Sequence, residues 1–144
     1  NGAYIACSTA VKRYLINRSP GVVYSTAPSP MQIAAMRAGW EKVPCLQTDV
    51  QILLNNAQQL RDALHSMGYD TGSSTTHIVP VIFQDAETTL RVQQSLAEHG
   101  IRVSAIRPPT VSPAQSRLRI ALTRLHNQTA VDALIKAFKA IRFL

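Results

Sequence analysis

The chain has 144 residues, 46% hydrophobic and 16% charged, which is enough apolar content for the core of one domain and excludes wholesale disorder. Its 15 lysines and arginines outnumber its 8 acidic residues, so the formal net charge is +7. The two cysteines, Cys7 and Cys45, exclude a disulfide scaffold, and no apolar run approaches the about 20 residues that cross a bilayer. Because the chain begins at Asn1 without an initiator Met or a secretory leader, we expect a processed or trimmed product.

The N-terminal part is predicted to be mostly helical and to act as a connector. Helix start and stop signals predict three helices, over residues 9–17, 30–41 and 48–67. Ser8 is the expected N-cap of the first helix, and Gly68 ends the third. Apolar and β-branched stretches predict two short strands, over residues 4–7 and 22–24. The stretch from Ser25 to Pro30 contains two prolines and predicts an extended turn.

From His77 onward, predicted strands and helices follow in the order strand, helix, strand, strand, helix. They cover residues 77–83, 85–99, 101–106, 116–123 and 127–142. Helical periodicity places these side chains inward: Leu90, Val92, Leu96, Val131, Leu134, Ile135, Phe138 and Ile141. This order predicts an α+β fold in which helices cover one face of a small, mainly antiparallel sheet. We divide the chain into a helical part, residues 1–76, and an α+β part, residues 77–144.

The positive charge favours an anionic partner, but its distribution does not favour nucleic acid. The only adjacent basic pair is Lys12-Arg13, and the aromatic residues are not interleaved with the arginines. The densest stretch has five arginines and no lysine: Arg102, Arg107, Arg117, Arg119 and Arg124. Because a guanidinium binds a carboxylate or phosphate with two parallel hydrogen bonds, this stretch predicts recognition of a planar anion, with a solvated basic face as the alternative.

Arg119 is the strongest candidate for a binding residue. It lies in the middle of an alternating strand, in which Leu118 and Ile120 point to the opposite face. We interpret it as a carboxylate anchor in a cleft; an exposed arginine paired with a local acid is the alternative. The prolines at residues 108–109 stiffen the nearby loop, so that the hydroxyl of Thr110 is held in place.

The sequence contains no assembled catalytic set. Ser25 and Thr26 place two hydroxyls in a turn, which suits a phosphate oxygen, with turn capping as the alternative. The four histidines have no metal-ligand spacing with one another or with a cysteine, and we expect structural roles for most of them. His126 alone follows the Arg119 strand, but no role can be assigned to it. We therefore predict no metal site.

Two segments resemble the C-terminal domain of the α-oxoamine synthases, which are pyridoxal-phosphate (PLP) enzymes of fold type I with the class I/II aminotransferase fold. They are Ala-Ile-Arg-Pro-Pro-Thr-Val at 105–111, and Ser-Arg-Leu-Arg-Ile-Ala-Leu-Thr at 116–123 followed by His126. The segment 24–30 is similar to an aromatic and hydroxyl segment of that family. Gly2-Ala3-Tyr4 is similar to the residues just after its cofactor-lysine loop. The resemblance covers the chain in order.

The resemblance implies an acyltransferase that joins an amino acid to an acyl thioester with loss of CO₂, in a cytoplasmic homodimer with PLP as cofactor. By position, Arg119 would hold the amino-acid carboxylate, and Thr110 would contact the substrate beside it. Ser25 and Thr26 would bind the PLP phosphate of the neighbouring subunit. The resemblance implies neither a membrane nor a nucleic-acid partner.

The chain also departs from the family pattern. The Schiff-base lysine is expected just before Asn1, and neither Lys12 nor Lys42 corresponds to it, so this chain alone is expected to be inactive and to hold no catalytic residue. Ser112-Pro113-Ala114 replaces the usual Pro-x-Gly, and Ser29 replaces a proline. Within the family, the biotin-synthesis branch is expected, which uses L-alanine and a pimeloyl thioester. Members that use glycine are one alternative, and a non-enzymatic basic module that binds an anion such as RNA is another.

Overall fold

The computed structural model describes residues 4–141, so the Gly2-Ala3 match lies outside the described residues. The chain divides between Leu46 and Gln47 into two compact units. The boundary predicted at residues 76 and 77 concerns the domains of a longer enzyme and stays a prediction.

The first unit is helical, as predicted. It contains α1 (Thr9–Arg18), α2 (Pro20–Val23), α3 (Pro30–Lys42) and the 3₁₀ helix η1 (Val43–Leu46). Ser8 caps α1, because its side chain accepts a hydrogen bond from the N–H of Val11. Ser29 and Gln32 form a reciprocal capping box at the start of α3. None of the three α-helices buries a residue, so the unit has no core of its own within the described residues.

Both strands predicted in this unit are wrong. Residues 4–7 have no regular secondary structure, and Val22 and Val23 belong to α2. A strand is stable only where a neighbouring strand receives its hydrogen bonds, and the described part of this unit contains no strand to pair with. Pro20, at the first position of α2, has a backbone angle that suits a helical turn, and β-branched side chains do not override it.

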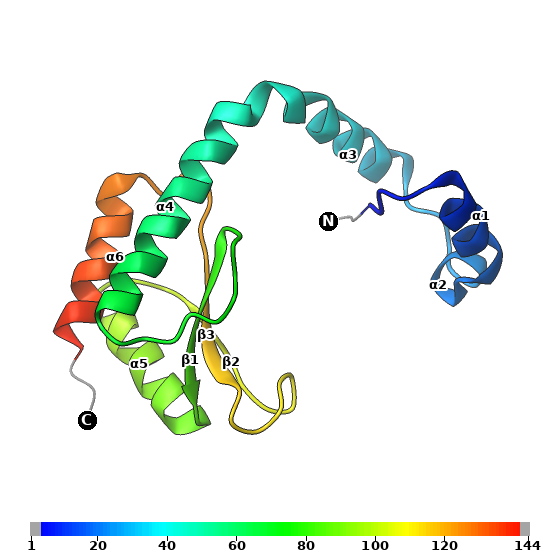
Figure 1. The fold of residues 1–144 in the computed structure, drawn as a ribbon. Helices are drawn as coiled ribbons and strands as arrows, with labels where there is room; N and C mark the ends of the chain where they lie inside the picture. The colour runs from blue at the N-terminus through cyan, green and yellow to red at the C-terminus, as the bar shows by residue number, and fades with distance from the viewer. Residues whose placement is uncertain (1–3, 142–144) are drawn as a thin grey trace. The chain divides into compact units, whose positions relative to one another are not determined.

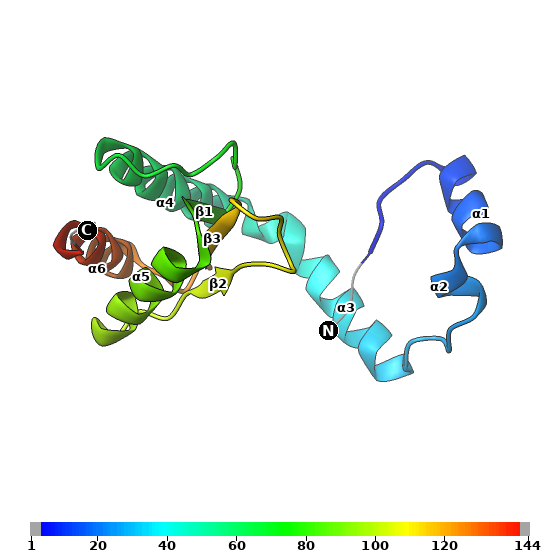
Figure 2. The ribbon, with the colours of Figure 1, turned by 90° about the horizontal axis from the view of Figure 1, so that it is seen from below.

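The second unit has the predicted α+β fold. Its elements are α4 (Gln47–Ser66), β1 (Ile78–Gln84), α5 (Ala86–Glu98), β2 (Ser104–Ile106), β3 (Ser116–Ala121) and α6 (Gln128–Ala140). The three strands form an antiparallel sheet in the order β1-β3-β2. Helices α4, α5 and α6 gather on one side of this sheet (Figures 1 and 2). These three helices do not cover the other side of the sheet, which can therefore offer a binding face.

The core lies between the sheet and these helices. It consists of alternate residues of the strands and of one stripe on each helix, among them Leu60, Leu64, Val79, Val81, Leu96, Leu118, Val131 and Phe138. Tyr69 packs edge-on against the ring of Phe138, with ring centroids 5.1 Å apart. Each fully buried side chain of this size stabilises the fold by about 1.5–3 kcal/mol, so this core fixes the position of the sheet.

Two predictions within this unit are wrong. Leu90 of α5 is 42% exposed, whereas Thr89 is completely buried, because the buried stripe runs through Thr89, Val92 and Leu96. The strand predicted over residues 101–106 is shorter, since pairing with β3 begins only at Ser104. The carbonyl of Val103 instead accepts a hydrogen bond from the side chain of Gln93, 2.8 Å away.

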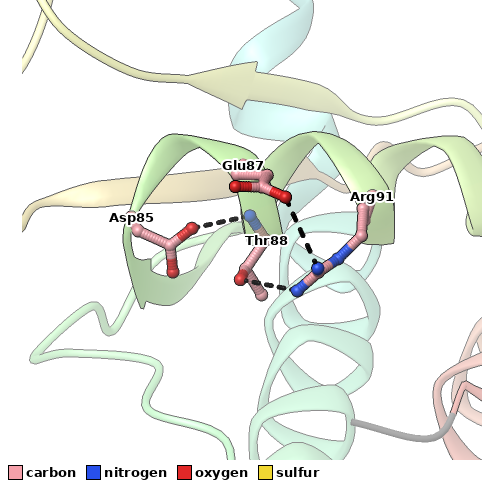
Figure 3. Close-up of polar contacts among 4 residues, drawn as sticks. All are labelled: Asp85, Glu87, Thr88 and Arg91. Carbon is pink, nitrogen blue, oxygen red and sulfur yellow. Dashed lines mark hydrogen bonds and ion pairs between the residues drawn. The ribbon is translucent and has the colours of Figure 1, made fainter. Parts of the chain in front are cut away.

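The start of α5 is capped by Asp85, whose carboxylate accepts a hydrogen bond from the N–H of Thr88 at 2.7 Å. Figure 3 shows this contact together with Arg91, which donates to the Thr88 hydroxyl and pairs with Glu87 at 3.7 Å. This network fixes the helix directly after β1. Within residues 4–141, no helix is both long and apolar enough to cross a membrane.

Candidate functional site

The face of the sheet opposite the helices carries the arginine predicted as an anchor. Burial alternates along β3, with Leu118 and Ile120 buried and Arg119 exposed, as expected. Arg119 is on the central strand, where it lies opposite Pro80 of β1 on one side and Ser104 of β2 on the other. The backbone that carries the guanidinium is therefore held by a neighbouring strand on each side.

Arg119 and Thr110 line one hollow of about 440 Å³ on this face. Ile78, Pro80 and Ile106 supply apolar lining, and the hydroxyls of Ser74 and Thr76 border the hollow as well. The structure thus brings together the two residues predicted to contact the substrate. That they bind an amino acid stays a prediction.

The guanidinium of Arg119 makes no hydrogen bond or ion pair with any residue between 4 and 141. The alternative of an arginine paired with a local acid is therefore not found there. Its neighbour Arg117 differs, because it donates to the carbonyl oxygen and to the side-chain oxygen of Gln115, at 2.9 and 2.7 Å. Arg119 retains all its donors for a ligand, whereas Arg117 holds the loop before β3.

The loop that carries Thr110 is held by a turn and by two prolines. The N–H of Thr110 donates to the carbonyl of Arg107 at 3.0 Å, and the bond between Pro108 and Pro109 is cis. Further along, Ala114 has φ +65°, in the left-handed region that favours glycine. This is the position at which the resembled family has glycine, so the backbone conformation there is the one that glycine adopts readily.

Ser25 and Thr26 lie in the other unit, in the irregular segment between α2 and α3, and both are exposed. As predicted, residues 25–29 form no helix or strand. The hydroxyl of Ser25 donates to the carbonyl of Gly21, whereas that of Thr26 makes no hydrogen bond within the described residues. Their binding of a phosphate stays a prediction.

The histidines make local contacts. His65 lies 2.6 Å from the hydroxyl of Thr71, and His99 lies 2.8 Å from the carbonyl of Ser95. His126 accepts a hydrogen bond at Nδ1 from the N–H of Thr123. In the part of the chain that the structure describes, no group of three or more histidine, cysteine or acidic residues is arranged to hold a metal ion.

The five clustered arginines do not all line one hollow. Arg102 borders a different hollow, of about 380 Å³, together with His99 and His126. Arg124 forms an ion pair at 2.5 Å with Asp49 of α4. The cluster is therefore divided among separate contacts, and only Arg117 and Arg119 line the hollow on the open face of the sheet.

Sequence reasoning missed two hydroxyl residues of the site and an arginine that contacts one of them. Ser74 and Thr76 line the hollow, and the carbonyl of Thr76 accepts a hydrogen bond from Arg61 of α4. The run of hydroxyl residues before β1 was the available signal for the first two. No sequence pattern indicated Arg61, because an arginine between apolar helix positions is usually solvent-exposed.

A protein-family model described as aminotransferase class I and II matches residues 1–138. A relative from Desulfosudis oleivorans, named putative 8-amino-7-oxononanoate synthase, is 41% identical over 141 residues, which is 98% of this chain and 37% of the relative. The chain therefore spans about a third of the length of the curated relatives it matches.

Parts of longer solved structures have the same fold as this chain. Serine palmitoyltransferase from S. paucimobilis, with bound PLP and myriocin, superposes with a TM-score of 0.78 at 21% identity, covering 89% of this chain and 33% of that one. An 8-amino-7-oxononanoate synthase from Francisella tularensis has a TM-score of 0.67 at 22% identity, covering 92% and 40%. Both similarities show the fold.

Proposed function

The chain belongs to the aminotransferase class I and II family, and on this premise we propose that it is the C-terminal part of a PLP-dependent α-oxoamine synthase of the 8-amino-7-oxononanoate type. In that proposal the whole enzyme is a cytoplasmic homodimer that condenses L-alanine with a pimeloyl-type thioester, with loss of CO₂. Residues 1–76 are then the end of the large domain and a connector, and residues 77–144 the small domain. The chain alone is inactive.

The observation that carries this proposal is the free guanidinium of Arg119 in a hollow that it shares with Thr110. A carboxylate placed there gains two charge-assisted hydrogen bonds, each with a net contribution of about 1.5–3 kcal/mol. The Thr110 hydroxyl adds a further donor in the same hollow. Holding the carboxylate at two points fixes the orientation of the amino acid, which is the condition for selective cleavage of one of its bonds.

The residues of this chain fit PLP only in part. When bound, PLP supplies an electron sink for the carbanion formed on the amino acid. Thr26 has an unused hydroxyl in an exposed segment, which suits a phosphate oxygen. Ser25 first has to release the carbonyl of Gly21 before it donates to a phosphate. We therefore infer that Thr26 is the stronger phosphate ligand of the two.

The test is a titration of the 144-residue chain with L-alanine, followed by NMR at the Nε–H of each arginine. We expect the Arg119 signal to shift with L-alanine and with propionate, and not with ethylamine, which lacks the carboxylate. In the R119A variant, the NMR signals of the other residues that line the hollow should no longer shift when L-alanine is added.

The matched control is R102A, because Arg102 also lacks a partner within the described residues but borders another hollow. R102A should bind L-alanine as the unmodified chain does. Equal shifts at Arg102 and Arg119, or an unchanged affinity in R119A, would reject Arg119 as the anchor. A clear preference for glycine over L-alanine would move the proposal to the glycine-using branch.

A further inference from the structure

Arg61 of α4 is a charged residue that is buried, whereas most arginines in proteins are exposed. Only 5% of it is exposed, and no carboxylate pairs with it in the part of the chain described. Its three hydrogen bonds go to neutral oxygens: the carbonyl of Thr76 at 2.7 Å, and the side-chain oxygen of Gln58 at 2.8 and 3.3 Å. Burying a guanidinium against neutral acceptors costs free energy, so its contacts need an explanation.

Gln58 supports the buried charge indirectly. Its amide oxygen accepts from Arg61, while its amide nitrogen donates to the carboxylate of Asp62 at 2.7 Å. The exposed carboxylate therefore polarises the amide that holds the guanidinium. This chain of hydrogen bonds keeps Arg61 pointing at the segment between α4 and β1.

That segment is a wall of the Arg119 hollow. Ser74 and Thr76 line the hollow, and their side chains bond the start of β1: the Ser74 hydroxyl donates to the carbonyl of Ile78 at 2.5 Å. The N–H of Ile78 donates to the Thr76 hydroxyl at 3.2 Å. These bonds fix the wall to β1, while Arg61 fixes it to α4 through the Thr76 carbonyl.

We propose that Arg61 is a positioning residue, which holds the Ser74–Thr76 wall in place and so keeps the shape of the hollow in which Arg119 binds a carboxylate. An apolar side chain of similar length fills the same space without the desolvation cost, so packing alone does not account for the guanidinium. The proposal rests on the proposed function for its ligand, but the order of the wall is measurable without any ligand.

The first experiment measures amide hydrogen exchange in the ligand-free 144-residue chain. In R61M we expect the Ile78 amide to exchange about tenfold faster or more, because the wall opens locally, while the Thr88 and Ala130 amides at the helix caps are unchanged. R61K keeps a donor for the Thr76 carbonyl and should restore slow exchange. Unchanged exchange at Ile78 in R61M would overturn the proposal.

A second variant keeps the test decisive if R61M fails to fold. Q58A removes an exposed side chain that is not part of the apolar core, and it should speed Ile78 exchange in the same direction by a smaller factor. A folded Q58A with unchanged Ile78 exchange, alongside a misfolded R61M, would show that Arg61 serves the fold only.

The last measurement separates this inference from the proposed function. L-alanine affinity at Arg119 should fall several-fold in R61M and recover in R61K. If the unmodified chain does not bind L-alanine, the proposed function fails while the exchange result still decides the role of Arg61. If L-alanine binds equally well with and without the Arg61 guanidinium, the positioning role is rejected and the proposed function stands.

Discussion

Thr123 and His126 hold each other in a closed turn directly after β3. The N–H of Thr123 donates to Nδ1 of His126 at 2.9 Å, and the N–H of His126 donates to the carbonyl of Thr123 at 3.0 Å. The carbonyl of His126 also accepts a hydrogen bond from Asn56 of α4. His126 thus joins the end of the sheet to α4, which gives a structural role to a residue to which the sequence assigned none.

H126A should destabilise the 144-residue chain by about 1 kcal/mol, because the N–H of Thr123 loses its acceptor. H126N offers a side-chain oxygen close to the position of Nδ1 and should recover part of the loss. Urea unfolding followed by circular dichroism measures both. An H126A variant with unchanged stability and weakened L-alanine binding would instead place His126 in the binding site.

A114G should stabilise the chain by roughly 0.5–1 kcal/mol, because the left-handed backbone costs alanine more than the extra unfolded-state freedom costs glycine. The φ of +65° at Ala114 is the basis of this prediction. The control is A121G, at an exposed position of β3, which should be destabilising. Thermal unfolding of both variants decides the sign, and destabilisation by A114G would contradict the backbone assignment.

Y69F should make the chain more resistant to alkaline unfolding. Burial raises the pKa of Tyr69 to about 12, so the folded chain keeps the phenol proton where the unfolded chain loses it. The stability contributed by this group is complete below pH 10 and is lost as the pH rises from 10 towards 12, by up to roughly 2–3 kcal/mol. Y69F lacks the titrating group, so its free energy of unfolding should fall less over this pH range.

The same variant has a second, opposite effect at neutral pH. It removes the hydrogen bond from the Tyr69 hydroxyl to the carbonyl of Phe138, which is 3.4 Å long, and keeps the ring contacts. Y69F should therefore be slightly less stable than the unmodified chain at pH 7, by about 1 kcal/mol or less. Urea midpoints at pH 7 and pH 11 measure the crossover, and parallel curves would refute the assignment.

The difference in stability between D85N and the unmodified chain should become smaller as the pH falls. The N–H of Thr88 donates to the carboxylate and lowers the pKa of Asp85. Because the pKa of Asp85 is lower in the folded state, the charged cap contributes its full stability above the unfolded pKa, near 4. This contribution is lost as the pH falls through the folded-state pKa. Melting temperatures at pH 6 and pH 2.5 test this, since Asn caps the helix without a charge. A gap of constant size would contradict the charge effect.

Local sequence signals predicted most of the secondary structure. Ser8 was predicted as a helix cap and acts as one, because a helix start needs only the next few backbone N–H groups. The alternation along β3 separated Arg119 from Leu118 and Ile120 correctly, because successive side chains of any strand point to opposite faces. The motif around Thr110 and Arg119 was enough to indicate the family.

The tertiary structure decided what depends on partners distant in the chain. Val22 and Val23 are helical because the described part of their unit offers no strand to pair with, and β2 is short because Gln93 takes the carbonyl of Val103. The hollow exists because β3 lies between Pro80 and Ser104, which aligns Arg119 with the loop of Thr110. Arg61 donates to the carbonyl of Thr76, which is 15 residues away in the chain. A single sequence carries no signal for such a contact, because the hydrogen bond forms only after α4 packs against β1.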